Sequence, residues 1–222
     1  MRTPGATAER TGPRVRNAAV RLFAQKGFAA VGVRELARAA ELTSASLYHY
    51  MGAKEDLLVD IMRSTIEPLI TAGDRALAAY DSPEAQLAAL AGVHVWMHGT
   101  EPEATLVADT ELRALSGRRE REMIALRDRY QGLWRSVVRA GVGEGTFDVT
   151  DESIAVIALL DLCNGVSHWY APAGRLALLD VCAVHADLAL AMVRAQRDGH
   201  PVRTEAMTLQ HPEWLLGTAP NH

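Results

Sequence analysis

The sequence is poor in cysteine and in aromatic residues, and it contains no long apolar run. Its two cysteines, Cys163 and Cys182, form no C-x-x-C motif, which excludes a disulfide scaffold or a zinc finger and makes a reducing, cytoplasmic location the expected one. No stretch reaches the roughly 18 uninterrupted apolar residues that a membrane span needs, so no membrane association is expected. The first residues carry no apolar segment typical of a secretory signal, and we expect none.

Patterns typical of β-strands are almost absent. Aromatic residues make up only 5% of the chain, and no clear run of four or more β-branched residues follows a two-residue period. Alanine and leucine recur at helical spacing instead. Apolar residues make up 49% of the chain, which is ample for a buried core, and charged residues make up 23%, so wholesale disorder is excluded. The sequence therefore predicts an all-α fold.

Patterns that carry enzyme chemistry are also missing. The sequence contains no Gly-rich phosphate loop, no Ser-His-Asp arrangement in a strand-turn-helix context and no conspicuous pair of carboxylates. We therefore expect neither an enzyme nor a bound cofactor.

Positive charge is concentrated at the N-terminus. The whole chain carries a net charge of −4, but residues 1–54 contain nine Lys and Arg against three acidic residues, while the remainder is acidic. This asymmetry predicts a module that meets a polyanion, joined to one that does not. The alternative is a chance excess in an arginine-rich arm.

The N-terminal quarter has the pattern of a helix-turn-helix. We expect helices at 13–26, 33–40 and 44–50, with a further helix that begins near residue 54 and is kinked or broken at Pro68. Leu36, Ala37 and Ala40 would pack on the first helix, Leu42 would point inward from the turn, and Leu47 would anchor the third helix. These three helices define a DNA-binding domain at 13–54, preceded by a flexible basic arm at 1–12.

The start of the third helix is small and polar, as entry into a major groove requires. Thr43, Ser44 and Ser46 would lie close to base edges, whereas Tyr48 and Lys54 would contact phosphates. Tyr48 as a packing residue and Lys54 as a solvated helix end are the alternatives. The predicted DNA-binding residues are Arg34, Thr43, Ser44, Ala45, Ser46, Tyr48, His49 and Lys54.

Four blocks in this region occur in order at a characteristic spacing. They are Phe23-Ala24-Gln25-Lys26-Gly27-Phe28, Val33-Arg34-Glu35-Leu36-Ala37, Ser44-Ala45-Ser46-Leu47-Tyr48-His49-Tyr50 and Lys54-Glu55-Asp56-Leu57-Leu58. Together they resemble the DNA-binding domain of the TetR family of bacterial repressors. The sequence departs from the family pattern at Gly32, Glu41, Ala45 and Met51, where Thr or Ser, Gly, Gly and Phe are usual. The resemblance implies a homodimer that binds operator DNA.

The rest of the chain is expected to be a larger helical domain at 55–198 for effector binding and dimerisation, followed by a mobile or loosely docked tail at 199–222. Helices near 153–171 and 176–197 are apolar over so wide an arc that they predict a buried seam. The resemblance implies a four-helix dimer interface there, and a monomer core is the alternative. A polar stripe of Asp161, Asn164 and His168 would face the seam, line a cavity or be satisfied inside the fold.

Aromatic, sulfur-bearing and polar residues of the body predict an apolar effector pocket. The candidate residues are Met62, His94, Met97, His98, Arg113, Tyr130, Trp134, Asn164 and Trp169. Each could equally be ordinary core. His94 and His98 also have the i, i+4 spacing of a metal pair, but no third ligand is evident nearby, so no metal site is predicted and a metal-responsive regulator remains an alternative.

Segments 110–121, 130–134 and 165–170 resemble TetR branches that respond to acyl-CoA thioesters. Arg118, Arg119 and Arg121 would meet the phosphates of such an effector, or they form a solvated helix start beside two glutamates. A smaller aromatic or apolar compound is the other effector class. The sequence therefore predicts a ligand-responsive repressor, with a constitutive DNA-binding protein or an enzyme with a basic arm as alternatives.

Overall fold

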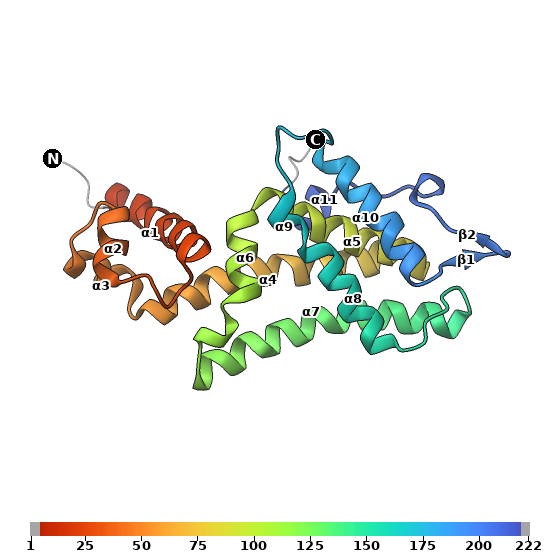
Figure 1. The fold of residues 1–222 in the computed structure, drawn as a ribbon, viewed down its shortest axis with the longest axis horizontal. Helices are drawn as coiled ribbons and strands as arrows, with labels where there is room; N and C mark the ends of the chain where they lie inside the picture. The colour runs from red at the N-terminus through yellow and green to blue at the C-terminus, as the bar shows by residue number, and fades with distance from the viewer. Residues whose placement is uncertain (1–4, 219–222) are drawn as a thin grey trace. The chain divides into compact units, whose positions relative to one another are not determined.

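The computed structural model describes residues 5–218, which divide into two compact units (Figure 1). The first contains the described residues up to Thr65 together with Glu103–Ile124, and the second contains Ile66–Pro102 and the residues from Ala125 onward. This division does not follow the boundary expected after residue 54, because a segment far along the chain joins the first unit.

Helices account for nearly all regular structure of the described residues, and the predicted all-α class is confirmed. The helices are α1 (Gly5–Lys26), α2 (Val33–Ala39), α3 (Ser44–Met51), α4 (Lys54–Ala79), α5 (Pro83–Thr100), α6 (Pro102–Thr110), α7 (Gly117–Glu144), α8 (Glu152–Asn164), α9 (Val166–Trp169), α10 (Leu178–Met192) and α11 (Pro212–Leu216). Two 3-10 turns, η1 (Leu112–Ala114) and η2 (Thr204–Ala206), and a hairpin of β1 (Gln196–Arg197) and β2 (His200–Pro201) complete the fold. None of these helices is long and apolar enough to cross a membrane.

Two prolines proved to be poor markers of helix ends. Helix α1 begins at Gly5, not at Pro13, so residues 5–12 are helical where a flexible arm was expected, and residues 1–4 lie outside the described part. Helix α4 likewise continues through Pro68 to Ala79. A proline inside a helix removes one hydrogen bond, and helices as long as α1 (22 residues) and α4 (26 residues) keep many others on both sides of it.

The first unit has the expected helix-turn-helix core. Helices α1, α2 and α3 contact one another, and their contact surfaces carry the predicted apolar residues. Phe23, Leu36 and Leu47 are at most 1% exposed. Leu42 in the turn is only half-buried, so its side chain is less inward than expected.

The second unit is organised around α5. Helices α8, α9, α10 and α11 all contact α5, and α10 packs along it most extensively (Figure 1). Because α5 is covered on several sides, it is buried almost throughout its length.

The C-terminal part of the second unit departs from the expected single long helix. Helix α10 ends at Met192, and the chain then forms the β1–β2 hairpin. Asp198 and Gly199, at the turn, both have positive φ angles of 53° and 76°. An Asp-Gly pair favours a two-residue hairpin turn of this kind. The helix itself ends earlier because Arg194, with a φ of 51°, leaves the helical conformation.

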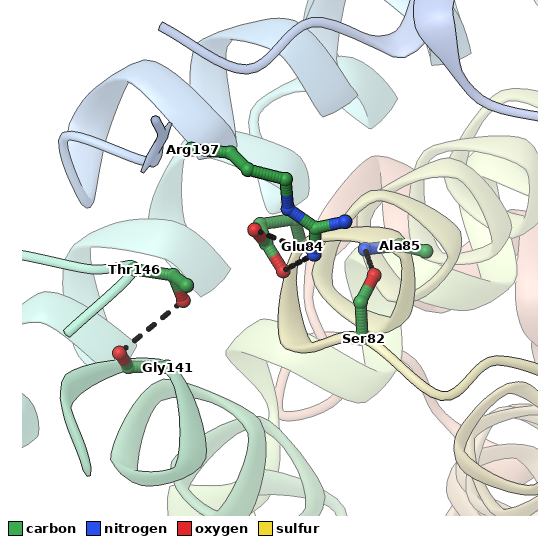
Figure 2. Close-up of polar contacts among 6 residues, drawn as sticks. All are labelled: Ser82, Glu84, Ala85, Gly141, Thr146 and Arg197. Atoms are coloured by element: carbon green, nitrogen blue, oxygen red, sulfur yellow. Dashed lines mark hydrogen bonds and ion pairs between the residues drawn. The ribbon is translucent and has the colours of Figure 1, made fainter. Parts of the chain in front are cut away.

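Specific contacts dock the hairpin and the segment after it. The Arg197 guanidinium donates hydrogen bonds of 3.2 and 3.3 Å to the carboxylate of Glu84, which is buried in the first turn of α5 next to the Ser82 N-cap (Figure 2). Arg75 Nη1 donates to the Leu215 carbonyl at 2.8 Å, and Leu215 is only 1% exposed. The described part of the tail, residues 199–218, therefore makes specific contacts with the second unit, and residues 219–222 lie outside the described part.

Candidate functional site

The inner face of α3 packs on the apolar core of the first unit. Leu47 is fully buried on its inner side, and Met51 is buried at its end. The side chain of Thr43 caps the helix by accepting a hydrogen bond of 3.1 Å from the Ser46 amide, and its hydroxyl also contacts the Ser46 hydroxyl at 2.9 Å. An N-cap of this type satisfies one of the free amides at the helix start. This packing and the cap together hold the outer face of α3 in a defined orientation.

The α2–α3 turn accommodates the unusual glutamate. Glu41 has a φ of 55°, in the left-handed region that the family pattern fills with glycine. The Leu42 amide closes the turn with a hydrogen bond of 2.8 Å to the Ala37 carbonyl, and Arg14 Nη2 donates to the Ala40 carbonyl at 2.7 Å. Gly32 begins α2 without a side-chain cap. These departures from the family pattern thus leave the helix-turn-helix intact.

The outer face of α3 carries most of the predicted DNA-binding side chains. Tyr48 is 55% exposed, Thr43 and Ala45 are exposed, and Ser44 and Ser46 are half-buried. Arg34 is exposed on α2, and the side chain of His49 lies outside the described part. The structure also exposes Tyr50, which is not among the predicted DNA-binding residues.

Lys54 lies differently from the other predicted DNA-binding residues. Its ammonium group donates hydrogen bonds to the carbonyls of Phe28 and Val31, at 2.7 and 2.8 Å, and lies 3.9 Å from the centre of the Phe28 ring. Partial burial lowers the pKa of Lys54 below its usual value. The side chain therefore fixes the loop between α1 and α2, a role that no local sequence pattern indicates.

Two ion pairs join α4 to the start of α7 within the first unit. Arg119 contacts the Asp56 carboxylate at 2.6 Å, and Arg63 pairs with Glu122. The hydrogen bonds that Asp56 accepts from Arg119 and from the Ala53 amide lower the pKa of its carboxyl group. Arg119, one of the three arginines predicted to meet CoA phosphates, is thus occupied by Asp56, whereas Arg118 and Arg121 are exposed.

The second unit brings four of the predicted effector residues together around His94. His94 Nε2 lies 2.8 Å from Asn164 Oδ1, and His94 Nδ1 lies 3.0 Å from the Tyr130 hydroxyl. The Trp134 ring meets the His94 ring edge to face, with centroids 5.9 Å apart. These side chains come from α5, α7 and α8, so their meeting depends on how these helices pack.

The hydrogen bonds determine the tautomer of His94. Because Asn164 Oδ1 can only accept, His94 Nε2 carries the proton, and Nδ1 of the neutral ring accepts from Tyr130. Burial and the neighbouring His98 hold the pKa of His94 well below its usual value, although the bond to Asn164 acts in the opposite direction. His94 is therefore an uncharged link in a buried polar cluster.

The histidine pair is not arranged as a metal site. The His94 and His98 rings are stacked with centroids 4.1 Å apart, and His98 Nδ1 donates to the His94 carbonyl at 2.9 Å. Both ring nitrogens of His94 are already hydrogen-bonded. Among residues 5–218, no group of three or more His, Cys, Asp or Glu side chains is placed to hold a metal ion. The geometry thus gives no support to the metal-responsive alternative.

The other four predicted effector residues are not part of the cluster around His94, and they lie in different parts of the chain. Met97 is buried on α5, whereas Trp169 is 56% exposed and stacks on His185. Met62 and Arg113 belong to the first unit, where Met62 is buried and Arg113 is exposed in η1. The effector contacts predicted for these four residues stay predictions.

The polar stripe predicted on α8 and α9 divides between two environments. Asn164 turns inward to His94, whereas Asp161 and His168 are exposed. Large apolar side chains are exposed on the same helices and on α10. They are Ile154, Ile157, Trp169, Leu179, Val184, Leu188 and Met192.

A pocket that the sequence did not indicate lies between α5, α10 and the C-terminal segment. It has a volume of about 320 Å³, and its lining includes Gly92, Cys182 and Pro212. It exists because the segment after the hairpin docks back on α5, which only the tertiary structure shows.

Both parts of the chain match described protein families. Residues 15–61 match "Bacterial regulatory proteins, tetR family", and residues 80–193 match "Tetracyclin repressor-like, C-terminal domain". The HTH-type transcriptional repressor KstR2 of Rhodococcus jostii (strain RHA1) is 28% identical over 191 residues, which cover 85% of this chain and 92% of that protein.

Solved structures agree with these matches. A TetR family transcriptional regulator, PfmR from Thermus thermophilus, superimposes with a TM-score of 0.71 and 30% identity, over 83% of this chain and 99% of that one. AibR, solved in complex with isovaleryl coenzyme A and operator DNA, has a TM-score of 0.72 at 19% identity, over 80% and 97% of the two chains. The second likeness concerns the fold alone.

Proposed function

Because this chain belongs to the tetR family of bacterial regulatory proteins, we propose that it represses transcription as a homodimer that binds operator DNA and releases it when a small, largely apolar effector binds. The observation that carries the proposal is the way α3 packs: Leu47 on its inner face is fully buried, while Tyr48 on its outer face is exposed. The N-terminal quarter of the chain, to which α3 belongs, also has an excess of positive charge.

In this proposal, α3 enters the major groove with its N-terminal residues foremost. Ser44, Ala45 and Ser46 approach base edges, whereas Tyr48 and Arg34 contact phosphates. Thr43 acts by holding the helix start, because its hydroxyl oxygen caps the helix by accepting from the Ser46 backbone amide. His49 is proposed on its sequence position alone.

A homodimer gives the two reading helices the spacing that operator half-sites require, about 34–36 Å for one turn of DNA. The exposed apolar side chains of α8 and α10 support an interface on these helices, since contiguous apolar patches on a protein surface are typical of association sites. An effector would release the operator by preferring a dimer in which the reading helices no longer match successive grooves.

For the effector, we propose an acyl-CoA as the class. The buried cluster around His94 supports a ligand site in the second unit, because a few convergent polar groups inside an apolar helical core are typical of small-molecule sites. The solved structure of AibR with isovaleryl coenzyme A shows that this fold accommodates such a ligand in another protein. A smaller aromatic or apolar compound is the competing class.

Fluorescence anisotropy on labelled DNA from upstream of the protein's own gene tests this function. We expect saturable binding that competes with unlabelled specific DNA much better than with random DNA, and a loss of at least tenfold in affinity for Tyr48→Ala. Trp214→Ala, which alters an exposed aromatic residue in α11, is the matched control and should bind normally. Equal competition by random DNA would overturn the proposal.

Titration of the preformed DNA complex tests the effector. Isovaleryl-CoA should lower the anisotropy to that of free DNA, and free coenzyme A should not. A complex that no acyl-CoA releases, but that an uncharged aromatic compound does, would assign the effector to the competing class. Release by neither class would favour a constitutive DNA-binding protein.

A further inference from the structure

We infer that Trp134 and Asn164 form a recognition site for a carbonyl oxygen of the effector, an inference that rests on the proposed function. The indole N–H of Trp134 is completely buried and has no hydrogen-bond partner among the described residues. A buried donor without an acceptor is costly and rare in folded proteins, and it calls for an explanation.

The cluster around His94 has a surplus of donors. The Nε2 proton of His94 goes to Asn164 Oδ1, and the Tyr130 hydroxyl proton goes to His94 Nδ1. Asn164 uses its Oδ1 acceptor in this way, and its side chain is half-buried, so its Nδ2 amide is a donor that a further group can reach. The indole N–H of Trp134 is therefore a buried donor without an acceptor, the Asn164 amide is a second donor, and both residues border the same His94 ring.

The group that these donors call for is a hydrogen-bond acceptor, and the cluster also indicates whether that acceptor is charged. A carbonyl oxygen accepts two hydrogen bonds, so it can accept from the indole N–H of Trp134 and from the Asn164 amide together. The histidine at the centre of the cluster is held neutral, so the cluster offers N–H dipoles without a full positive charge. A carboxylate or phosphate buried against such a site would keep much of its desolvation cost. The geometry therefore favours the uncharged carbonyl of a thioester, ester or ketone.

Tyr130 and His94 act as positioning residues in this arrangement. The Tyr130–His94–Asn164 chain of hydrogen bonds holds the Asn164 side chain by its oxygen, which leaves the Nδ2 amide directed away from His94. Because each member is buried or half-buried and bonded to the next, the amide keeps one orientation before a ligand arrives.

Two pairs of probes, each matched for the carbonyl, test the inference on the full-length protein. The first pair is isovaleryl-CoA and S-(3-methylbutyl)-CoA, the thioether that lacks only the carbonyl oxygen. The second pair is 2-undecanone and undecane, a ketone and the matching alkane, and it tests carbonyl recognition in the absence of coenzyme A. In each pair, the compound with the carbonyl should bind about three- to thirtyfold more tightly, the range for one or two net hydrogen bonds.

Indole ¹⁵N NMR locates the contact. The chain has four tryptophans, and Trp134→Phe assigns the Trp134 signal. We expect the carbonyl compound to move the Trp134 N–H proton downfield, and its carbonyl-free partner to leave that proton nearly unmoved. Replacement of Trp134 by 3-benzothienylalanine, which keeps the shape but lacks the N–H, should abolish the preference within each pair, even if Trp134→Phe does not fold. Asn164→Leu should reduce it.

The outcomes separate this inference from the proposed function. Equal affinity within both pairs, or binding of none of the four probes, overturns the carbonyl site. If the DNA complex is nevertheless released equally by isovaleryl-CoA and its thioether, the proposed repressor function stands without it. If specific DNA is not bound at all, the repressor function fails, whatever the NMR titration shows.

Discussion

At the scale of single residues, the contacts of the Lys54 ammonium group distinguish a phosphate-binding role from a structural one. Sequence position suggested a phosphate contact, but the side chain donates to the carbonyls of Phe28 and Val31 and covers the Phe28 ring. A hydrogen bond that involves a charged group contributes more to stability than one between neutral groups. We therefore assign Lys54 to the support of the α1–α2 loop.

Lys54→Ala should lower the free energy of unfolding of the first unit by about 1–3 kcal/mol, because two carbonyls lose their donor. Urea denaturation followed by circular dichroism measures this change. Operator affinity should fall, but the slope of log K against log[salt] should remain that of the wild type. A slope reduced by about one would instead show a lost phosphate contact and restore the role expected from sequence.

Glu41 offers a second test at this scale, because it holds a φ of 55° without being glycine. Its ion pair with Arg14, at 3.8 Å, is exposed and contributes little. Glu41→Gly should stabilise the protein by about 0.5–1 kcal/mol, since glycine adopts this backbone conformation without steric cost. Thermal unfolding measures the gain, and Glu41→Val, which is β-branched, should destabilise instead. A loss of stability with glycine would contradict this account.

At the scale of elements, the β1–β2 hairpin is held to α5 by a long-range ion pair. Glu84 is 1% exposed, while its partner Arg197 is 59% exposed (Figure 2). The backbone N–H of Gln196 also donates a hydrogen bond of 2.9 Å to the Thr146 carbonyl, which ties the hairpin to the loop between α7 and α8. The hairpin thus connects three segments that are distant in sequence.

Arg197→Ala should destabilise the second unit by about 1–2 kcal/mol, because it leaves the buried Glu84 carboxylate without its counterion. The loss is smaller than for a fully buried pair, since Arg197 is largely solvent-exposed. Chemical denaturation measures it. The neighbouring Arg203→Ala removes an exposed arginine from the same segment and is the control. If both variants lose the same stability, the ion pair does not hold the hairpin.

At the scale of the whole molecule, the exposed apolar face of α8 and α10 is the feature that a single chain leaves unexplained. Leu188 is 46% exposed on α10, and Val184 and Met192 are exposed on either side of it. Water contact of so many large apolar side chains is unfavourable, and burial in a dimer would remove it.

Leu188→Arg should convert the protein to monomers, because the interface would then bury a charge without a partner. Multi-angle light scattering should report half the wild-type mass, and operator affinity should fall sharply, since one reading helix replaces two. Ile124→Arg changes an apolar side chain of similar exposure on α7 and should leave the dimer intact. A dimer that survives Leu188→Arg would move the interface to another surface.

The helix-turn-helix could be predicted because its determinants are local. The spacing of Phe23, Leu36 and Leu47 indicates which face of each helix is buried, and the positive φ of Glu41 follows from its place in the tight turn. Patterns of this kind depend on residues a few positions apart. They were sufficient for the all-α class and for the outline of the DNA-binding part.

Only the tertiary structure decided which distant residues meet. Arg119 pairs with Asp56 across 63 positions, and Arg197 pairs with Glu84 across 113. Asn164 turns toward His94, while its expected companions Asp161 and His168 stay exposed. A side chain on a helix has the same local pattern whichever neighbour it faces, so its partner is determined by how the helices pack against one another.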